Sequence, residues 1–336
     1  MQEESIVLDH GSGGRMSHEL IAEYFVSALD NEPLKRLNDS AVVDIPSGRI
    51  ALSTDSYTVD PIFFPGGDIG SLAVHGTVND IAMSGARPVY LTVGFILEEG
   101  FPMDDLRRIL QSMSRAAREA GVKVVAGDTK VVPRGKADKI FINTAGVGVI
   151  ERNVTLGGEC ALAGDAVLVS GAIGDHGACV LASREGLSFS SPVVSDSASL
   201  NGLVELILDT ADGVHVLRDP TRGGLATTLN EIALQSGVGV EIDEDRVPYR
   251  ESVLGMCEIL GLDPLYLANE GKLIAIVQND QAEALLAAMR SHELGRESRI
   301  IGRVAADHPG KVVMNTAVGG RRILDMLIGE QLPRIC

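Results

Sequence analysis

Apolar residues in the first half of the chain recur at two spacings, one typical of helices and one typical of strands. Apolar positions three and four residues apart predict helices at 20–29, 71–84 and 103–120. Runs of apolar and β-branched residues predict strands at 89–97, 122–126 and 140–150, with a strand pair within 41–55 around Pro46-Ser47-Gly48.

The second half repeats this alternation of elements. We expect helices at 198–209, 222–235, 251–260, 281–290 and 321–329, and strands at 165–170, 238–242, 272–277 and 312–315. Alternating helices and strands over 336 residues predict an α/β (α+β) protein with two domains. We divide the chain into a glycine-loop segment and helix (1–37), a first domain (38–151), a second α/β domain (152–330) and a mobile tail (331–336).

Charge and cysteine content narrow the range of partners. The net charge of −17 and the absence of tryptophan argue against nucleic acid and against an anionic membrane surface. An acidic protein can still bind a nucleotide if divalent cations bridge carboxylates to phosphates. There is no C-x-x-C pair, the start is acidic, and no apolar run approaches 18 residues, so we expect a reduced, soluble, cytoplasmic protein.

Four aspartates are the candidate metal ligands. Asp39, Asp55, Asp80 and Asp128 lie just after or between apolar elements. Carboxylates near strand ends converge readily, and Mg²⁺ takes oxygen ligands from a few carboxylates together with phosphate. Asp80 interrupts an otherwise apolar helix face, where an unpaired charge is costly. The alternative for each is a turn or cap aspartate.

Two glycine-containing loops precede helices and suit phosphate binding. The first, Gly11-Ser12-Gly13-Gly14-Arg15, offers backbone donors. The second, Arg218-Asp219-Pro220-Thr221-Arg222-Gly223-Gly224, adds arginine and hydroxyl groups, although Asp219 or Thr221 could simply cap the helix. Glu270 occupies a turn before a strand and is a candidate base. His176, in a tight turn at 171–177, has no companion at metal-ligand spacing and is interpreted as structural.

The chain ends on a thiol. Gln331-Leu332-Pro333-Arg334-Ile335-Cys336 contains a proline that excludes helix, and six extended residues can reach roughly 20 Å. Sulfur at a chain end is expected to pack against little, so its presence favours chemistry. The alternative is an incidental, frayed terminus.

These motifs together resemble the ATP-binding superfamily of aminoimidazole ribonucleotide synthetase, selenophosphate synthetase and thiamine-monophosphate kinase. Within it, the chain is most similar to the HypE family of hydrogenase maturation factors. The resemblance covers essentially the whole chain and is carried by these segments: His10–Gly14, Ser53–Tyr57, Asp60-Pro61, Phe63–Gly67, Asn79-Asp80, Gly94–Gly100, Gly127–Val132, Phe141–Gly146, Gly174–Ala178, Ala268–Leu273 and Pro333–Cys336.

The resemblance implies a PurM-like fold and a specific reaction. The first domain's sheet would pair with its twin across a dyad, giving a homodimer with ATP near the interface. The partner HypF would load a carbamoyl group onto Cys336. ATP would then dehydrate this S-carboxamide to a thiocyanate, and the cyano group would pass to iron on the HypC–HypD complex.

The resemblance also assigns residues. ATP binding would fall to Gly13, Gly14, Asp39, Asp55, Asn79, Asp80, Asp128, Thr129, Arg222 and Gly223, with Mg²⁺ held by Asp39, Asp55, Asp80 and Asp128. Lys130 and Glu270 would share charge stabilisation and proton removal, and Cys336 would be the covalent carrier.

The residues alone are also compatible with two alternative functions. One is a kinase or synthetase of the same superfamily that acts on a free substrate. Selenophosphate synthesis fits poorly, because no cysteine precedes position 160. The other is a non-catalytic scaffold or metal chaperone that uses the terminal thiol.

Overall fold

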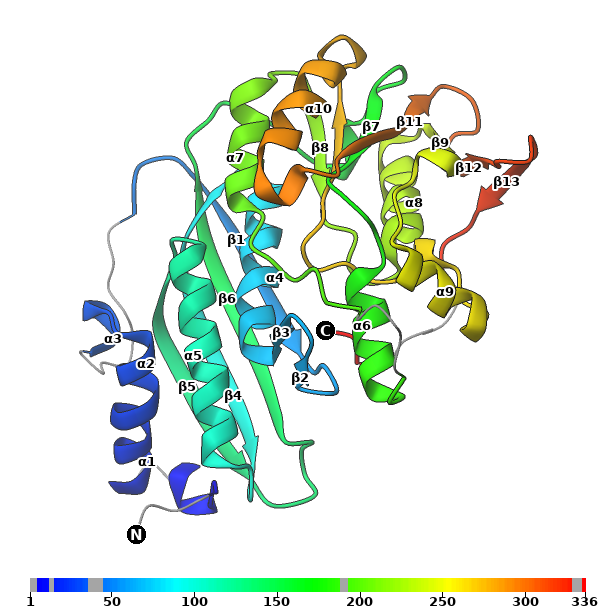
Figure 1. The fold of residues 1–336 in the computed structure, drawn as a ribbon. Coiled ribbons are helices and arrows are strands. Elements are labelled where there is room, and N and C mark those ends of the chain that lie inside the picture. Colours follow the sequence, from blue (N-terminus) through cyan, green and yellow to red (C-terminus); the bar gives the residue numbers. More distant parts are fainter. Residues whose placement is uncertain (1–4, 12–14, 36–44, 188–192, 328–333) are drawn as a thin grey trace.

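The structure is a computed structural model that describes residues 5–11, 15–35, 45–187, 193–327 and 334–336. The described residues form two large sheets with helices packed against them and one two-stranded sheet. The longest helices of the first half lie between the N-terminal segment and the second domain (Figure 1). Part of the predicted strand pair at 41–55 lies outside the described residues.

The core of the first domain lies between the first sheet and the helices that cover one of its faces. Among the described residues the strands of this sheet run in the order β1-β6-β4-β5, and β4 and β5 form its parallel pair. The strands are β1 (Arg49–Tyr57), β4 (Arg87–Glu98), β5 (Lys123–Val132) and β6 (Ile140–Ile150). Helices α4 (Ile69–Met83) and α5 (Met103–Glu119) cover one face.

Alternation along β4 shows which face is covered. Leu91, Val93, Phe95 and Leu97 are buried, whereas Ile96 between them is 43% exposed. Successive strand residues point to opposite faces, so the sheet has one helix-covered face and one open face. Leu52 on β1, 76% exposed, also lies on the open face.

Short helical segments before β1 pack beside α5 and β5. They are η1 (Leu8–Gly11), α1 (Arg15–Leu20), the π-helix η2 (Ile21–Val26), α2 (Ser27–Leu29) and α3 (Glu32–Lys35). The predicted helix at 20–29 is therefore confirmed, and it begins earlier, at Arg15. Phe25 fixes this segment to the first sheet through an edge-on contact with Phe95, 4.9 Å between ring centroids. The small pair β2 (Phe63–Phe64) and β3 (Gly67–Asp68) leads into α4.

The second sheet forms the centre of the second domain. In the part of the chain that the structure describes, its order is β13-β12-β9-β11-β7-β10-β8, with β12 and β9 parallel. The strands are β7 (Ala166–Val169), β8 (Val214–Arg218), β9 (Gly239–Asp243), β10 (Ile274–Val277), β11 (Arg299–Ala305), β12 (Val312–Asn315) and β13 (Arg321–Leu324).

Helices α7 (Asn201–Thr210), α8 (Gly224–Ser236) and α10 (Ala282–Ser291) cover this sheet. Helices α6 (Asp175–Arg184) and α9 (Glu251–Leu260) pack against each other and join the core of the first domain. The short turns are η3 (Gly158–Cys160), η4 (Glu244–Arg246), η5 (Pro264–Tyr266), η6 (Asn279–Gln281) and η7 (Glu293–Gly295). One core lies under α8 and another under α7 and α10. Because β10 is buried on both faces, its sequence Ile-Ala-Ile-Val is wholly apolar.

Two local predictions are wrong. The expected helix at 321–329 begins instead as strand β13, because the turn Thr316–Gly320, with Gly319 at φ 87°, forms a hairpin with β12. Residues 328 and 329 lie outside the described part. The turn expected at 171–177 ends early, because α6 starts at Asp175 after Gly174, which has φ 86°.

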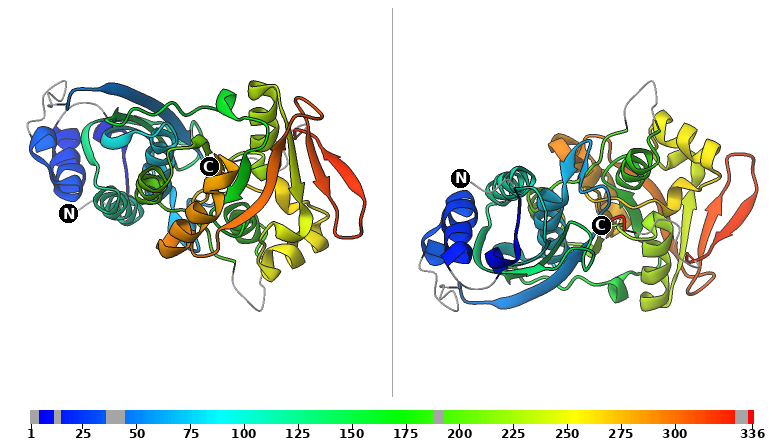
Figure 2. Two further views of the ribbon diagram at one scale, coloured as in Figure 1. Left: turned by 90° about the horizontal axis from the view of Figure 1, so that it is seen from above. Right: turned by 90° about the horizontal axis from the view of Figure 1, so that it is seen from below.

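The chain end lies between the two domains. Both views in Figure 2 place it near the middle of the molecule, where the blue-green and the yellow-red halves meet. Within the described residues, no helix combines the length and the apolar character needed to cross a bilayer.

Candidate active site

Four carboxylates gather where α4 meets the second sheet. Asp55 comes from β1, Asp80 from α4, Asp219 from the loop before α8, and Glu270 from the turn before β10. We call these four residues the carboxylate cluster. Their negative charges act on one another: Asp219 and Asp80 each contribute to the raised pKa of Glu270.

The first domain contributes the two more accessible members. Asp55 faces the helix-covered side, because its neighbours across the sheet, Thr144 and Val93, are buried there. Asp80 lies one turn from the end of α4, and Ser53 on β1 donates a hydrogen bond to its Oδ2 at 2.7 Å. Burial raises the pKa of Asp80, and the charge of Asp55 adds to this effect.

The second domain contributes the two more enclosed members. Glu270 is 3% exposed, and burial raises its pKa well above the ordinary value. Burial and the charge of Asp80 raise the pKa of Asp219 to about 7. Its Oδ2 is buried and has no hydrogen-bond partner among the described residues. An orphaned carboxylate oxygen beside other carboxylates is a position for a proton or a cation.

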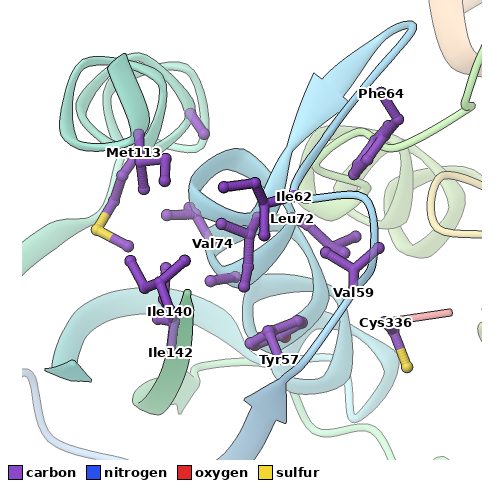
Figure 3. Close-up of a cluster of buried hydrophobic side chains, with 14 of the residues drawn as sticks. Tyr57, Val59, Ile62, Phe64, Leu72, Val74, Met113, Ile140, Ile142 and Cys336 are labelled. Atoms are coloured by element: carbon purple, nitrogen blue, oxygen red, sulfur yellow. The ribbon is translucent and has the colours of Figure 1, made fainter. Parts of the chain in front are cut away.

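The terminal thiol lies beside this cluster. Arg222 Nε donates a hydrogen bond to Cys336 Sγ at 3.2 Å. Burial and the nearby charge of Glu270 raise the pKa of the Cys336 thiol to about 12, although Arg222 opposes the shift. Figure 3 shows Cys336 next to Val59 at the edge of the first domain's core.

The last three residues are docked by backbone hydrogen bonds. A terminal oxygen of Cys336 accepts from Thr58 N at 2.9 Å, and Arg334 O accepts from Asp60 N at 3.2 Å, so the chain end runs beside the segment after β1. His176 Nε2 lies 2.8 Å from Ile335 O. The expectation that the thiol packs against little is therefore wrong, because its side chain is 7% exposed.

Arginines secure this docking from both domains. Arg184 on α6 donates to Arg334 O at 2.9 Å and to Asp60 O at 2.7 Å. The Arg334 side chain donates to Thr58 O at 2.8 Å and pairs with Asp138, which lies between β5 and β6. His176, expected to be structural, does contribute to structure, since it links Ser195 to the chain end.

The open face of the first sheet carries two of the predicted site residues. Asp128 on β5 lies opposite Gly94, which lies opposite Asn143, and these residues point away from the helices. Lys130 Nζ pairs with Asp128 Oδ1 at 2.7 Å, and both side chains are more than 60% exposed. Within one chain, the structure does not bring Asp128 and Lys130 together with Asp55, Asp80 and Glu270.

The chain matches two family models over most of its length. Residues 37–150 match the N-terminal domain of AIR synthase related proteins, and residues 163–315 match the C-terminal domain. Carbamoyl dehydratase HypE of Azotobacter vinelandii is 58% identical over 332 residues, which cover 99% of this chain and 97% of the relative. The chain belongs to the HypE family. This assignment confirms the resemblance and the PurM-like fold inferred from the motifs.

Solved HypE structures have the same fold. A crystal structure of hydrogenase maturation protein HypE in complex with ATP has a TM-score of 0.95 at 59% identity, covering 98% of this chain and 99% of that one. A crystal structure of a HypE–HypF complex contains a chain with a TM-score of 0.81 at 52% identity, covering 92% of this chain and 99% of that one.

The remaining predicted residues of this HypE-family chain have different surroundings. Asn79 is 1% exposed; its side chain donates to the carbonyls of Ala198 and Glu270 and accepts from Leu200 N. Through these hydrogen bonds, Asn79 of α4 holds the backbone of the turn at Glu270. Thr129 is half-buried on β5. Gly13, Gly14 and Asp39 lie outside the described residues.

The loop before α8 shows why glycine is needed there. Gly223 is the N-cap of α8 at φ 74°, and the helix start has no side-chain cap. The alternative in which Asp219 or Thr221 caps this helix is therefore wrong. A Cβ on Gly224, at φ 61°, would lie 2.5 Å from Leu265 O, so only glycine brings the loop this close to the segment before Glu270.

Sequence reasoning missed part of this HypE site. Asp219 was considered only as a cap, and its position between two arginines in Arg218–Arg222 was the available signal. Arg184, Thr58 and Asp138, which hold the chain end, gave no local signal because their partners in the chain end lie 150 to 278 residues away in the sequence.

The donor set fits a magnesium–nucleotide better than a bare metal ion. Among the described residues, no three His, Cys, Asp or Glu side chains are grouped closely enough to hold a metal ion. Mg²⁺ takes one or two carboxylates and completes its shell with water and phosphate oxygens. Asp55 and Asp80, with the orphaned oxygen of Asp219 nearby, suit that arrangement.

Proposed function

We propose that this HypE-family chain is an ATP-dependent carbamoyl dehydratase that acts on its own C-terminal cysteine. The reaction converts the S-carboxamide of Cys336 to a thiocyanate and so supplies the cyanide ligand of the iron centre in [NiFe]-hydrogenase maturation. The observation that carries the proposal is the docked thiol of Cys336 beside Arg222 and the carboxylate cluster.

The chemistry needs a better leaving group and a base. The carboxamide oxygen attacks the γ-phosphorus of ATP and ADP leaves, after which the oxygen departs with the phosphate as the C≡N bond forms. Two N–H protons are lost in all. Glu270, whose raised pKa makes it a stronger base than an exposed glutamate, is the proposed proton acceptor, and its charge acts on the Cys336 thiol.

Arg222 suits the developing charge. Its guanidinium already contacts the sulfur. Its positive charge would stabilise the negative charge that develops on the carbamoyl oxygen and on the phosphate oxygens during phosphoryl transfer. When bound, Mg²⁺ supplies charge neutralisation at the phosphate oxygens. The residues proposed to hold it are Asp39, Asp55, Asp80 and Asp128, and the nucleotide would also contact Gly13, Gly14, Asn79, Thr129, Arg222 and Gly223.

A homodimer would explain the separated residues. Ile50, Leu52 and Ile96 are exposed apolar side chains on the open face of the first sheet, a pattern typical of an interface. If two such faces meet around a dyad, Asp128 and Lys130 lie at the interface, where they can approach the partner's nucleotide, whereas Thr129 between them points to the helix-covered face. Lys130 then complements Glu270 from across the dyad.

The partners follow from the same cycle. The docked thiol is protonated and enclosed, so carbamoylation by HypF requires the tail to leave its site. This excursion of the chain end is the proposed role of the tail predicted at 331–336, of which residues 331–333 lie outside the described part, and delivery of the cyano group to HypC–HypD requires it again. We also propose a cytoplasmic location, since all four cysteines are free thiols.

The test is the mass of the C-terminal peptide. Carbamoylated protein incubated with Mg-ATP should lose one water from the peptide that ends in Cys336, with ADP formed in equal amount. Omission of Mg²⁺ should prevent the loss, and Cys336→Ala should abolish both carbamoylation and ATP turnover. ATP consumption with an unchanged peptide mass would contradict the proposal.

A further inference from the structure

A buried ion pair lies directly behind the turn that carries Glu270. The carboxylate of Asp196 is 2% exposed and accepts from Lys272 Nζ at 3.2 Å, where the lysine side chain is 11% exposed. The reaction proposed above uses neither residue. Burying two charges costs desolvation energy, so such a pair is weak evidence for a role in stability alone.

Asp196 also binds the backbone of this turn. Its Oδ1 accepts from Glu270 N at 3.2 Å, and its Oδ2 accepts from Gly271 N at the same distance. With Lys272, one carboxylate therefore contacts three consecutive residues. Carboxylates that accept several N–H groups hold a backbone conformation firmly, because these charge-assisted bonds are stronger than neutral ones.

The close approach is built into the sequence. A Cβ at position 271 would lie 1.7 Å from Asp196 O, so the turn needs glycine to reach this segment. The other side of the turn is fixed as well, since Glu270 O accepts from Ala198 N at 3.3 Å and from Asn79 Nδ2 at 3.3 Å. The backbone of Glu270 is thus held from both sides, and its carboxylate is near enough to Cys336 and to the other carboxylates for their charges to affect one another.

We propose that Asp196, paired with Lys272, is a positioning residue that fixes the 269–272 turn and so aims the Glu270 carboxylate at the Cys336 carbamoyl group. This inference rests on the proposed dehydratase function and assigns Asp196 a role within it. Asp196 does not touch the reacting atoms.

Several charges act on Glu270 besides Asp196. The carboxylates that act on Glu270 are Asp219 before α8, Asp55 on β1 and Asp80 on α4. Glu270 also interacts electrostatically with Arg222, Cys336 and Tyr57. The negative charge of Asp196 is one of the causes that raise the pKa of Glu270. Removing that charge should therefore lower the pKa of Glu270 and shift the acidic limb of the rate profile to lower pH.

The experiment compares Asp196→Asn with wild-type protein in single-turnover dehydration of the carbamoylated chain. We expect ATP affinity to change by less than about threefold and the rate of water loss to fall about 10- to 100-fold, because a small misplacement of a catalytic group is costly. The acidic limb should move down in pH. The double variant Asp196→Asn/Lys272→Met removes both charges and tests the turn without an unpaired lysine.

Asp165→Asn is the matched control. Asp165 is also a buried aspartate of the second domain, 4% exposed and paired with His215 at 2.8 Å, but it faces neither Glu270 nor Cys336. It should alter the melting temperature at least as much while leaving the dehydration rate and pH profile unchanged.

Three outcomes would contradict either the positioning role of Asp196 or the proposed base role of Glu270. Wild-type rates in a folded Asp196→Asn or double variant overturn the inference. Equal effects of Asp196→Asn and Asp165→Asn on melting temperature and rate, with no shift in the acidic limb, also overturn it. Full activity of Glu270→Gln would instead refute the proposed base, and this outcome is separate because it does not involve Asp196.

Discussion

At the scale of single residues, the site depends on charges whose protonation the fold has altered. Asp219 is the clearest case, since its pKa is raised to about 7 and one of its oxygens has no partner among the described residues. Glu270 and the Cys336 thiol are shifted in the same direction by burial. The raised pKa values of Asp219 and Glu270 favour their protonated forms in the free protein, and a bound cation would displace these protons.

Asp219 gives a prediction about stability and pH. A carboxyl whose pKa is higher in the folded than in the unfolded state stabilises the fold fully below the unfolded pKa, near 3.8, and this contribution is lost as the pH rises to about 7. Asp219→Asn, which cannot ionise, should therefore raise the melting temperature at pH 8 and change it little at pH 4.

The measurement is thermal unfolding of the nucleotide-free protein at both pH values. Asp212→Asn is the control, since Asp212 is an exposed aspartate nearby in the sequence. A stabilisation by Asp219→Asn that is equal at pH 4 and pH 8 would show that the titration of Asp219 does not cause it.

At the scale of elements, residues 334–336 form a short segment that packs onto both domains. It is held by the loop after β1, by His176 and Arg184 on α6, and by Asp138 between β5 and β6. These contacts come from both domains, since α6 belongs to the second domain and the other two segments to the first, so docking the tail also connects the two domains. The thiol becomes accessible only when these contacts open together.

The pair Arg334–Asp138 gives a prediction about tail release. Both side chains are partly exposed, at 33% and 46%, so the pair should contribute at most about 1 kcal/mol to docking. Asp138→Ala should then increase the population of the undocked tail, and the rate of Cys336 alkylation by iodoacetamide, by up to about fivefold.

Asp209→Ala is the matched control for tail release. Asp209 pairs with Arg152 at the surface and has no contact with the chain end. Alkylation should be followed by mass spectrometry of the C-terminal peptide without nucleotide. An unchanged rate in Asp138→Ala would mean that this pair does not restrain the tail.

At the scale of the whole molecule, the first sheet divides the predicted site residues between its two opposite faces. Asp55 and Asp80 face the second domain, whereas Asp128 and Lys130 face outward on the same face as exposed Ile96, which lies opposite Lys130. A single chain therefore carries the base and the thiol on one side and a second set of polar groups on the other. A dimer is the simplest arrangement that uses both.

The proposed dimer gives a prediction about assembly and activity together. Leu52→Asp places a charge on the open face, on β1, and should convert the dimer to a monomer, because an unpaired charge cannot be buried in an apolar interface. ATP turnover should fall at least about 10-fold if Lys130 acts on the partner's site.

Ile259→Asp is the control, since Ile259 is 74% exposed on α9, away from this face. Sedimentation velocity and ATP turnover should be measured on both variants. A monomeric Leu52→Asp variant with full turnover would show that each chain has a complete site, and a dimeric variant would place the interface elsewhere.

The family, the two α/β domains and most of the elements can be predicted from the amino-acid sequence alone. Glycines, aspartates and the terminal cysteine carry local motifs, and helices such as α5 follow directly from their apolar spacing. The strand β13 was missed because four residues of a hairpin give a weaker signal than the apolar residues that follow them.

Only the tertiary structure decided which of these residues meet. Whether Asp55 and Asp128 share a face depends on the register across β1, β6, β4 and β5, and a slip of one residue would reverse it. The enclosure of Cys336, the orphaned oxygen of Asp219 and the support of Glu270 by Asp196 arise from contacts between distant segments. Local sequence patterns carry no information about such contacts, because the partners are brought together only when the domains pack.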